Sequence, residues 1–105
     1  MQKLTQELKE QIVQALKPLK PKKIVLFGSF AYGKPTKDSD LDICVVENDY
    51  LNRWDEKRKI REYLSFLTMP KDILNPKYNE YEFYKNEYGS VYRDIEQNGE
   101  VLWSS

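Results

Sequence analysis

The sequence contains no histidine and one cysteine among its 105 residues. Without histidine, catalytic triads built on an imidazole and metal sites with histidine ligands are excluded. The single cysteine, Cys44, cannot form a disulfide within the chain, so we expect a reducing, cytoplasmic setting. Any catalysis must therefore use carboxylates, hydroxyls, lysines or a bound metal ion.

The sequence also lacks a long apolar run and an excess of either charge. No run approaches the roughly 18 residues of a membrane span, and the amino terminus has no signal-peptide pattern, so we expect no membrane association. Seventeen basic residues balance seventeen acidic ones, which predicts no direct binding of nucleic acid. The length favours a single domain over residues 1–105.

Hydrophobic periodicity predicts helices and strands in alternation. The expected elements are a helix over 3–17 ended by Pro18 and Pro21, a strand over 23–27, a short helix from Ser29 to Gly33, a strand over 40–46, a helix over 52–67, a strand over 69–74, and helical structure from Pro76 with a break near Gly89, a cap at Gly99 and a small extended segment over 101–103. This order predicts an α/β (α+β) fold in which helices flank a small mixed sheet.

A Gly-Ser pair follows the first predicted strand and begins a short helix. Gly28 permits close approach of the backbone to a phosphate, and the helix start offers free N–H groups. Ser29 adds a hydroxyl donor. The plainer interpretation is a strand-to-helix turn in which Ser29 is only the N-cap.

Two aspartates, Asp40 and Asp42, stand where the second predicted strand begins, although aspartate is depleted in strands. Alternation places both carboxylates on one face, opposite Leu41 and Ile43. Two such carboxylates can bind one Mg²⁺ ion or a pair of them for phosphoryl chemistry. The alternative is that they merely decorate a turn.

Asp72 is the acidic residue of the third apolar run. If the second and third strands are neighbours, Asp72 reaches the Asp40 and Asp42 face, where it completes a metal site or accepts a proton from an attacking hydroxyl. The alternative is an edge-strand aspartate in water. Glu47 and Asp49 are the fallback candidates.

Taken together, Gly28-Ser29 and, ten residues later, Asp40-Leu41-Asp42 after an Asp-Ser pair resemble the signature of the polymerase-β-like nucleotidyltransferase superfamily. More narrowly, the chain resembles the minimal nucleotidyltransferase (MNT) proteins over nearly its full length. The resemblance implies that Gly28, Ser29 and Ser39 bind the nucleotide. It also implies that Asp40, Asp42 and Asp72 bind Mg²⁺ and carry catalysis.

The resemblance further implies transfer of AMP from ATP to an acceptor hydroxyl with release of pyrophosphate. Many MNT proteins are antitoxins that adenylylate a tyrosine of a small helical HEPN-domain ribonuclease encoded nearby. Transfer to a small hydroxylated molecule, or a module that neutralises its partner by docking alone, are the alternatives. Assembly into a homo-oligomer stays open.

One position departs from the family pattern. Many relatives carry Ala-Arg-Gly in the short helix, whereas this sequence has Ala-Tyr-Gly, with Tyr32 in place of the arginine. A tyrosine cannot neutralise a phosphate charge, although Lys34 or Lys37 could substitute for the arginine.

Tyrosines recur near helical spacing in the C-terminal part, at Tyr78, Tyr81, Tyr84, Tyr88 and Tyr92. They predict either a half-buried helix face that covers the sheet or a stripe that binds a partner.

Overall fold

Within residues 4–33 and 38–105, which the computed structural model describes, four strands form one mixed sheet in the order β3-β2-β1-β4. The strands are β1 (Lys23–Phe27), β2 (Leu41–Val46), β3 (Lys71–Leu74) and β4 (Glu100–Ser104). β1 pairs antiparallel with both β2 and β4, whereas β2 pairs parallel with β3. The predicted small mixed sheet is confirmed.

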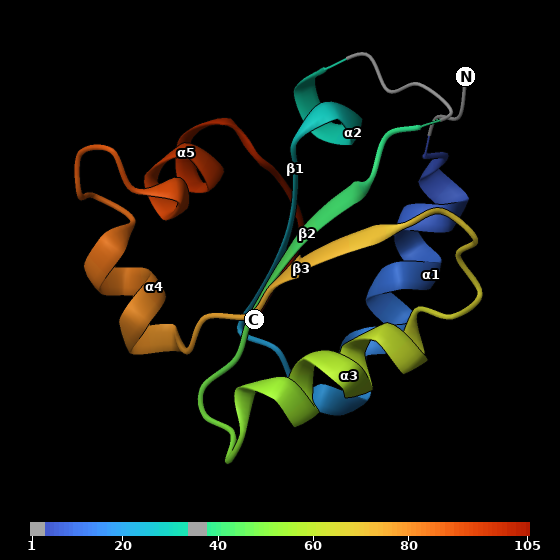
Figure 1. Cartoon of the computed structure of the whole chain (residues 1–105), viewed down its shortest axis with the longest axis horizontal. Helices are drawn as coiled ribbons and strands as arrows, with labels where there is room; N and C mark the ends of the chain where they lie inside the picture. Colours follow the sequence, from blue (N-terminus) through green and yellow to red (C-terminus); the bar gives the residue numbers. More distant parts are fainter. Residues whose placement is uncertain (1–3, 34–37) are drawn as a thin grey trace.

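Helices cover both faces of this sheet (Figure 1). On one side lie α1 (Gln6–Leu16) and α3 (Arg53–Tyr63), and on the other lie α4 (Tyr78–Tyr84) and α5 (Val91–Asn98). A single turn, α2 (Ser29–Tyr32), follows β1, and a 3₁₀ turn, η1 (Lys17–Leu19), follows α1. None of the helices in the described part of the chain is long and apolar enough to cross a membrane.

The central strand β2 is buried on both faces, which explains its nearly continuous apolar sequence. Leu41, Ile43 and Val45 point into the core under α1 and α3. Cys44 and Val46 point the other way, into a second cluster with residues of α4 and α5. By alternation, the side chain of Asp42 lies on the α4 and α5 side of the sheet.

The N-terminal helix is shorter than the predicted span of 3–17. It begins after Thr5, whose hydroxyl accepts a hydrogen bond from the Leu8 N–H at 3.1 Å and so caps the helix. Its α-helical part ends at Leu16, and Pro18 stands at the start of the following 3₁₀ turn. The prediction that proline ends the helix is therefore confirmed.

The helix predicted over 52–67 also ends early, at Tyr63. The apolar stripe nevertheless continues, because Leu64 and Leu67 are buried in the turn that follows, where the Leu67 N–H donates to the Leu64 carbonyl at 3.0 Å. A hydrophobic pattern reports which side chains reach the core, and a tight turn satisfies it as well as a helix does.

The C-terminal region divides into α4 and α5 near Gly89, as predicted. Gly99 follows α5, but its backbone is extended, not left-handed. A Cβ atom there would lie 2.6 Å from both the Ile95 carbonyl oxygen and Val25 Cγ1, so glycine is required by close packing. The small extended segment predicted over 101–103 is a full edge strand, β4, paired with β1.

Candidate active site

The Gly-Ser turn and the aspartate pair, ten residues apart in sequence, are in contact in the fold. β1 and β2 are antiparallel neighbours, and their register places Phe27 opposite Asp42. The next residue, Gly28, has φ +73°, and a Cβ atom on it would overlap the Oδ2 atom of Asp42. The Asp42 carboxylate therefore lies directly on the turn, in space that only glycine leaves free.

Asp72 joins this site from the neighbouring strand. β2 and β3 are parallel, and their register pairs Asp42 with Asp72. Paired residues of adjacent parallel strands point to the same face of a sheet, so the two carboxylates lie side by side. The condition stated for Asp72, that the second and third strands be neighbours, is met.

The pKa of the Asp42 carboxyl is raised above its ordinary value. The largest cause is partial burial, followed by the negative charges of Asp72 and then of Asp40. Asp40 immediately precedes β2 and is exposed. The three carboxylates therefore form one electrostatic cluster, with Asp42 at its centre, that a cation would stabilise.

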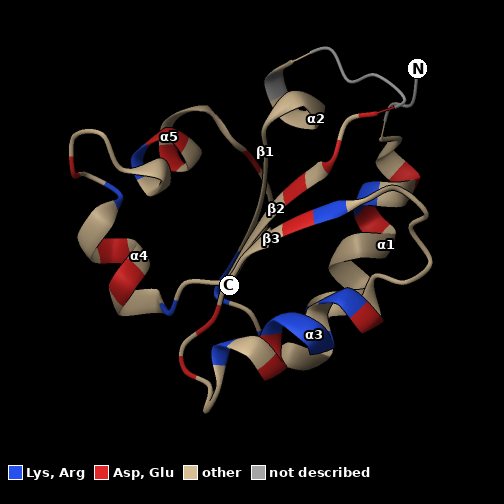
Figure 2. Ribbon diagram, in the orientation of Figure 1, with Lys and Arg blue, Asp and Glu red and all other residues tan. Residues whose placement is uncertain are grey.

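This cluster lies at one end of the sheet, away from the part that α4 and α5 cover. Asp72 is exposed and Asp42 is half-buried, whereas Cys44, two residues further along the same face of β2, is fully buried. Figure 2 shows acidic residues at the neighbouring starts of β2 and β3. A ligand can therefore approach the carboxylates from solvent.

The donor set suits Mg²⁺, which prefers carboxylate oxygens. Within residues 4–33 and 38–105, no three or more Asp, Glu, His or Cys side chains are arranged so that they could bind one metal ion together. Mg²⁺ in nucleotide-dependent enzymes typically uses only one or two carboxylates and completes its shell with water and substrate phosphates. The adjacent Asp42 and Asp72 meet that smaller requirement.

The turn itself supplies hydrogen-bond donors beside the carboxylates. Gly28 is the N-cap of α2, and the Ala31 N–H donates back to its carbonyl at 3.0 Å. The N–H groups of Ser29 and Phe30 come first in the helix and have no carbonyl four residues before them within it. The half-buried Ser29 adds its hydroxyl at the same place.

Three further residues from the sequence interpretation are located as follows. Ser39 is half-buried and directly precedes Asp40. Tyr32 is the last residue of α2, so the family's arginine position belongs to the turn beside the cluster. Lys34 and Lys37 lie outside the described residues.

The two fallback residues do not belong to this site. Glu47 lies just past the far end of β2, 2% exposed, and faces Glu56 of α3 and Asn75. Asp49 is farther along the chain and forms an ion pair with Lys77 at 3.0 Å.

Phe27 is a neighbour of the site that the sequence analysis did not single out. It pairs with Asp42 across the β1–β2 ladder and is half-buried. Directly paired side chains share a face, so an aromatic ring lies beside the carboxylate and helps to exclude water from it. Its position immediately before Gly28-Ser29 was the available signal.

The C-terminal tyrosines do not form one stripe, because they belong to two helices and the turn between them. Tyr81 is buried, and its ring lies 5.7 Å from that of the half-buried Tyr92. Tyr84 and Tyr88 are exposed beside Phe83 and Val91. Tyr81 and Tyr92 therefore pack in the cluster that covers the sheet, whereas Tyr78, Tyr84 and Tyr88 are exposed.

Comparison with solved structures finds the same fold. One similar structure is a toxin-antitoxin complex with AMP-PNP, with 24% identity and a TM-score of 0.67 over 92% of this chain and 73% of that one. Another is a tri-AMPylated Shewanella oneidensis HEPN toxin in complex with MNT antitoxin, with 22% identity and a TM-score of 0.62 over 96% and 74% of the two chains. No curated protein sequence gives a significant match.

A family model covers almost all of the sequence. The model of the nucleotidyltransferase domain matches residues 6–102, a range that includes the Gly28 turn and all three aspartates of the cluster. The contact of the Gly28 turn with the Asp42 carboxylate agrees with this match, and the chain belongs to the nucleotidyltransferase domain family.

Proposed function

We propose that this protein transfers AMP from ATP to a hydroxyl group of a partner protein in an Mg²⁺-dependent reaction. The observation that carries the proposal is the contact of Gly28 with Asp42, together with the in-register pairing of Asp42 with Asp72. It joins a phosphate-binding turn to two carboxylates within one open site.

In this proposal the chain's residues divide the work between binding and proton transfer. The N–H groups that begin α2 and the Ser29 hydroxyl hold the triphosphate against the turn. Asp42 and Asp72, with the charge of Asp40 beside them, would hold Mg²⁺, which supplies charge neutralisation for the phosphates and the leaving group. Phe27 and the Gly28 backbone exclude water on the strand side of Asp42.

The reaction proceeds by in-line attack. The acceptor oxygen forms a bond to the α-phosphorus, the bond from that phosphorus to the bridging oxygen of the β-phosphate breaks, and pyrophosphate leaves with its electron pair. The acceptor hydroxyl loses its proton, and Asp72, an exposed carboxylate of the cluster, can accept it.

We further propose that the acceptor is a tyrosine of a HEPN-type toxin encoded nearby, so that the chain acts as the antitoxin. Support comes from the relative described as an AMPylated HEPN toxin in complex with MNT antitoxin and from the relative with the ATP analogue AMP-PNP.

Mass spectrometry of the partner tests both statements. The neighbouring gene product is incubated with the protein, ATP and Mg²⁺, and a tyrosine should gain the mass of one adenylyl group (AMP less one water), with no gain when EDTA replaces Mg²⁺. Asp42→Asn should reduce transfer by about 100-fold or more, as loss of a preorganised electrostatic group does. Asp55→Asn, an exposed aspartate of α3, is the matched control and should keep full activity.

Tight complex formation without any mass gain would contradict the transfer reaction and would leave neutralisation by docking alone.

A further inference from the structure

Far from the acidic cluster, the connection from α1 to β1 carries a hollow of about 410 Å³ that is lined by lysines and by no Asp or Glu side chain. We call it the lysine hollow; its lining residues are Lys17, Lys20, Pro21, Lys22, Trp103 and Ser105. In a chain with no net charge, three ammonium groups gathered around one concave surface are a marked local excess.

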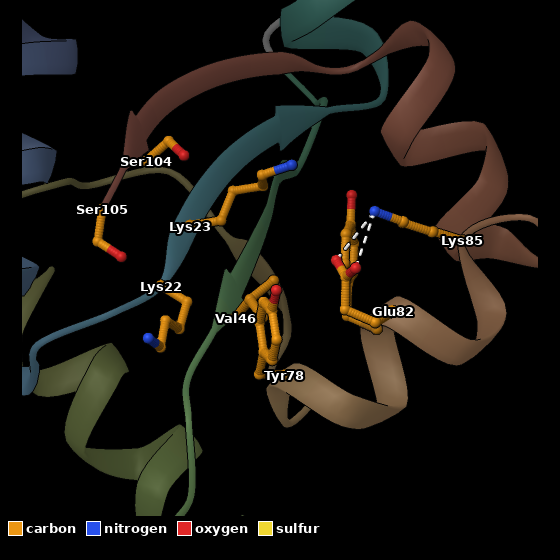
Figure 3. A pocket seen from close by; sticks show the side chains of 9 residues that line it. Lys22, Lys23, Val46, Tyr78, Glu82, Lys85, Ser104 and Ser105 are labelled. Atoms are coloured by element: carbon orange, nitrogen blue, oxygen red, sulfur yellow. Dashed lines mark hydrogen bonds and ion pairs between the residues drawn. The ribbon is translucent and has the colours of Figure 1, made fainter.

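A second hollow of about 290 Å³ adjoins the first and shares Lys22 and Ser105 with it. Figure 3 shows Lys22 and Lys23 at the start of β1, Ser104 and Ser105 at the end of β4, and Lys85 across the hollow. Here the other two lysines are already paired, Lys23 with Glu96 at 3.1 Å and Lys85 with Glu82 at 3.0 Å.

The lysines of the lysine hollow are different. In the described part of the chain, no carboxylate lies within ion-pairing distance of Lys17, Lys20 or Lys22. The Lys17 ammonium lies 4.8 Å from the centre of the Trp103 ring, and that of Lys22 lies 5.7 Å from the centre of the Tyr78 ring. Three positive charges therefore remain available to an external anion.

The backbone that presents these lysines is fixed on several sides. Lys20 has φ +54°, a left-handed conformation that is strained for a non-glycine residue. The Lys22 N–H donates to the Val46 carbonyl at 2.7 Å, and the Ser105 N–H donates to the Lys22 carbonyl at 3.0 Å. The backbone of this turn is therefore held in one conformation, so binding a ligand there would cost little ordering of the backbone.

The lysine hollow is separate from the candidate active site. β1 leads from Lys23, beside the hollow, to Phe27, which pairs with Asp42. Four residues of strand span about 13 Å, so phosphates bound at the Gly28 turn do not reach these lysines. An anion bound in the hollow would therefore be distinct from those phosphates.

We propose that the lysine hollow binds an acidic segment of the protein partner. The inference rests on the proposed function only for the existence of that partner. Three ammonium groups along one connection match several carboxylates in a row, and such complementarity speeds and orients docking.

Single-stranded nucleic acid fits less well. The Trp103 ring is partly buried against the core and Lys17 lies over it, so the ring is not a free platform for base stacking. The lining also contains no arginine, the residue best suited to bidentate contacts with phosphate.

Fluorescence anisotropy with a labelled octaglutamate peptide tests the proposal without ATP, Mg²⁺ or the partner. We expect binding at low salt that weakens as salt rises. The double variant Lys20→Gln/Lys22→Gln should weaken binding about 10-fold or more. The matched double variant Lys57→Gln/Arg61→Gln on α3 removes the same charge and should leave the affinity unchanged.

Equal weakening in both double variants would overturn the proposal, because only net charge would then matter. Tighter binding of an octauridylate than of octaglutamate would also overturn it, in favour of nucleic acid.

A second readout uses the partner protein itself. Lys20→Gln/Lys22→Gln should raise the partner concentration for half-maximal AMP transfer about 10-fold and leave the rate at saturation unchanged. If no AMP transfer occurs at all while octaglutamate still binds through these lysines, the proposed function fails and the docking surface stands.

Discussion

At the scale of single residues, Gly28 is the position where the two parts of the candidate active site meet. We expect Gly28→Ala to lower the free energy of unfolding by about 1–3 kcal/mol, because its φ of +73° is strained for alanine and its Cβ would displace the Asp42 carboxylate. Urea denaturation measures the loss, and binding of AMP-PNP should disappear with it.

Gly89→Ala is the matched control for this substitution. Gly89 also has a positive φ, +81°, but a Cβ atom there has no neighbour within 4 Å. Gly89→Ala should lower the free energy of unfolding only by the cost of the backbone strain, and it should still bind AMP-PNP. Equal stability losses and unchanged binding in the two variants would mean that Gly28 is an ordinary turn glycine.

Asp42 tests whether the carboxylates are structural or functional. Its pKa is raised by burial, Asp72 and Asp40, so the ionised form destabilises the fold in the absence of a cation. We expect Asp42→Asn to leave the melting temperature at pH 7 without metal unchanged or higher. AMP-PNP with Mg²⁺ should stabilise the wild type and not the variant.

A loss of about 1 kcal/mol or more in metal-free Asp42→Asn, as for a lost helix cap, would instead make the aspartate structural.

Glu47 is a buried carboxyl outside the active site, and both of its oxygens lack a hydrogen-bond partner among the described residues. Burial raises its pKa to about 8 from an ordinary 4.5, with Glu56 adding to the rise and Asn75 and Lys59 opposing it. The folded state therefore binds this proton more tightly than the unfolded state does. The free energy of unfolding that this proton contributes falls as the pH rises from about 4.5 through about 8.

Glu47→Gln should remove this part of the pH dependence and make the variant more stable than wild type at pH 9. We expect a difference of about 1–3 kcal/mol, the usual cost of an unsatisfied buried polar group. Melting curves from pH 5 to pH 9 measure it, with Glu62→Gln on the exposed side of α3 as control. Parallel wild-type and Glu47→Gln curves would refute the assignment.

At the scale of elements, a hydrogen-bonded network joins α4 to α5 and β1. The Tyr81 hydroxyl donates to Glu96 at 2.6 Å, and Lys23 of β1 donates to the same carboxylate at 3.1 Å. These contacts hold the pKa of Glu96 below its ordinary value, with Tyr81 as the larger cause.

Tyr81→Phe should cost about 1–3 kcal/mol of unfolding free energy, because the lost hydrogen bond has a charged acceptor. Hydrogen exchange should also become faster in α4 and α5. Tyr88→Phe is the control, since this side chain is 94% exposed, and it should change neither quantity. Unchanged exchange in Tyr81→Phe would mean that packing alone holds the two helices.

The order and kinds of elements were predictable from periodicity, but their ends and pairing were not. Local patterns show that 101–103 is extended, yet its pairing with β1 joins residues about eighty positions apart, and no local signal encodes that. Leu67 shows the same limit after the end of α3, because its burial comes from a turn that positions it over the core.

At the scale of the whole molecule, the site was predictable as a set of residues, while its assembly depended on strand register. Asp42 meets Gly28 because β1 and β2 are antiparallel neighbours, and it meets Asp72 because β2 and β3 are parallel and in register. In the sequence Glu47 was as acidic a candidate as Asp42. It follows the last residue of β2, however, and so lies buried at the opposite end of that strand from the site.

The central claim is that this assembled site transfers a nucleotide, and the fate of the α-phosphate tests it most directly. The protein, its neighbouring gene product and Mg²⁺ are incubated in parallel with ATP labelled at the α-phosphate and ATP labelled at the γ-phosphate. The account predicts label on the partner from α-labelled ATP only, and none with Asp42→Asn. Label from γ-labelled ATP, or equal α-labelling by wild type and Asp42→Asn, would contradict it.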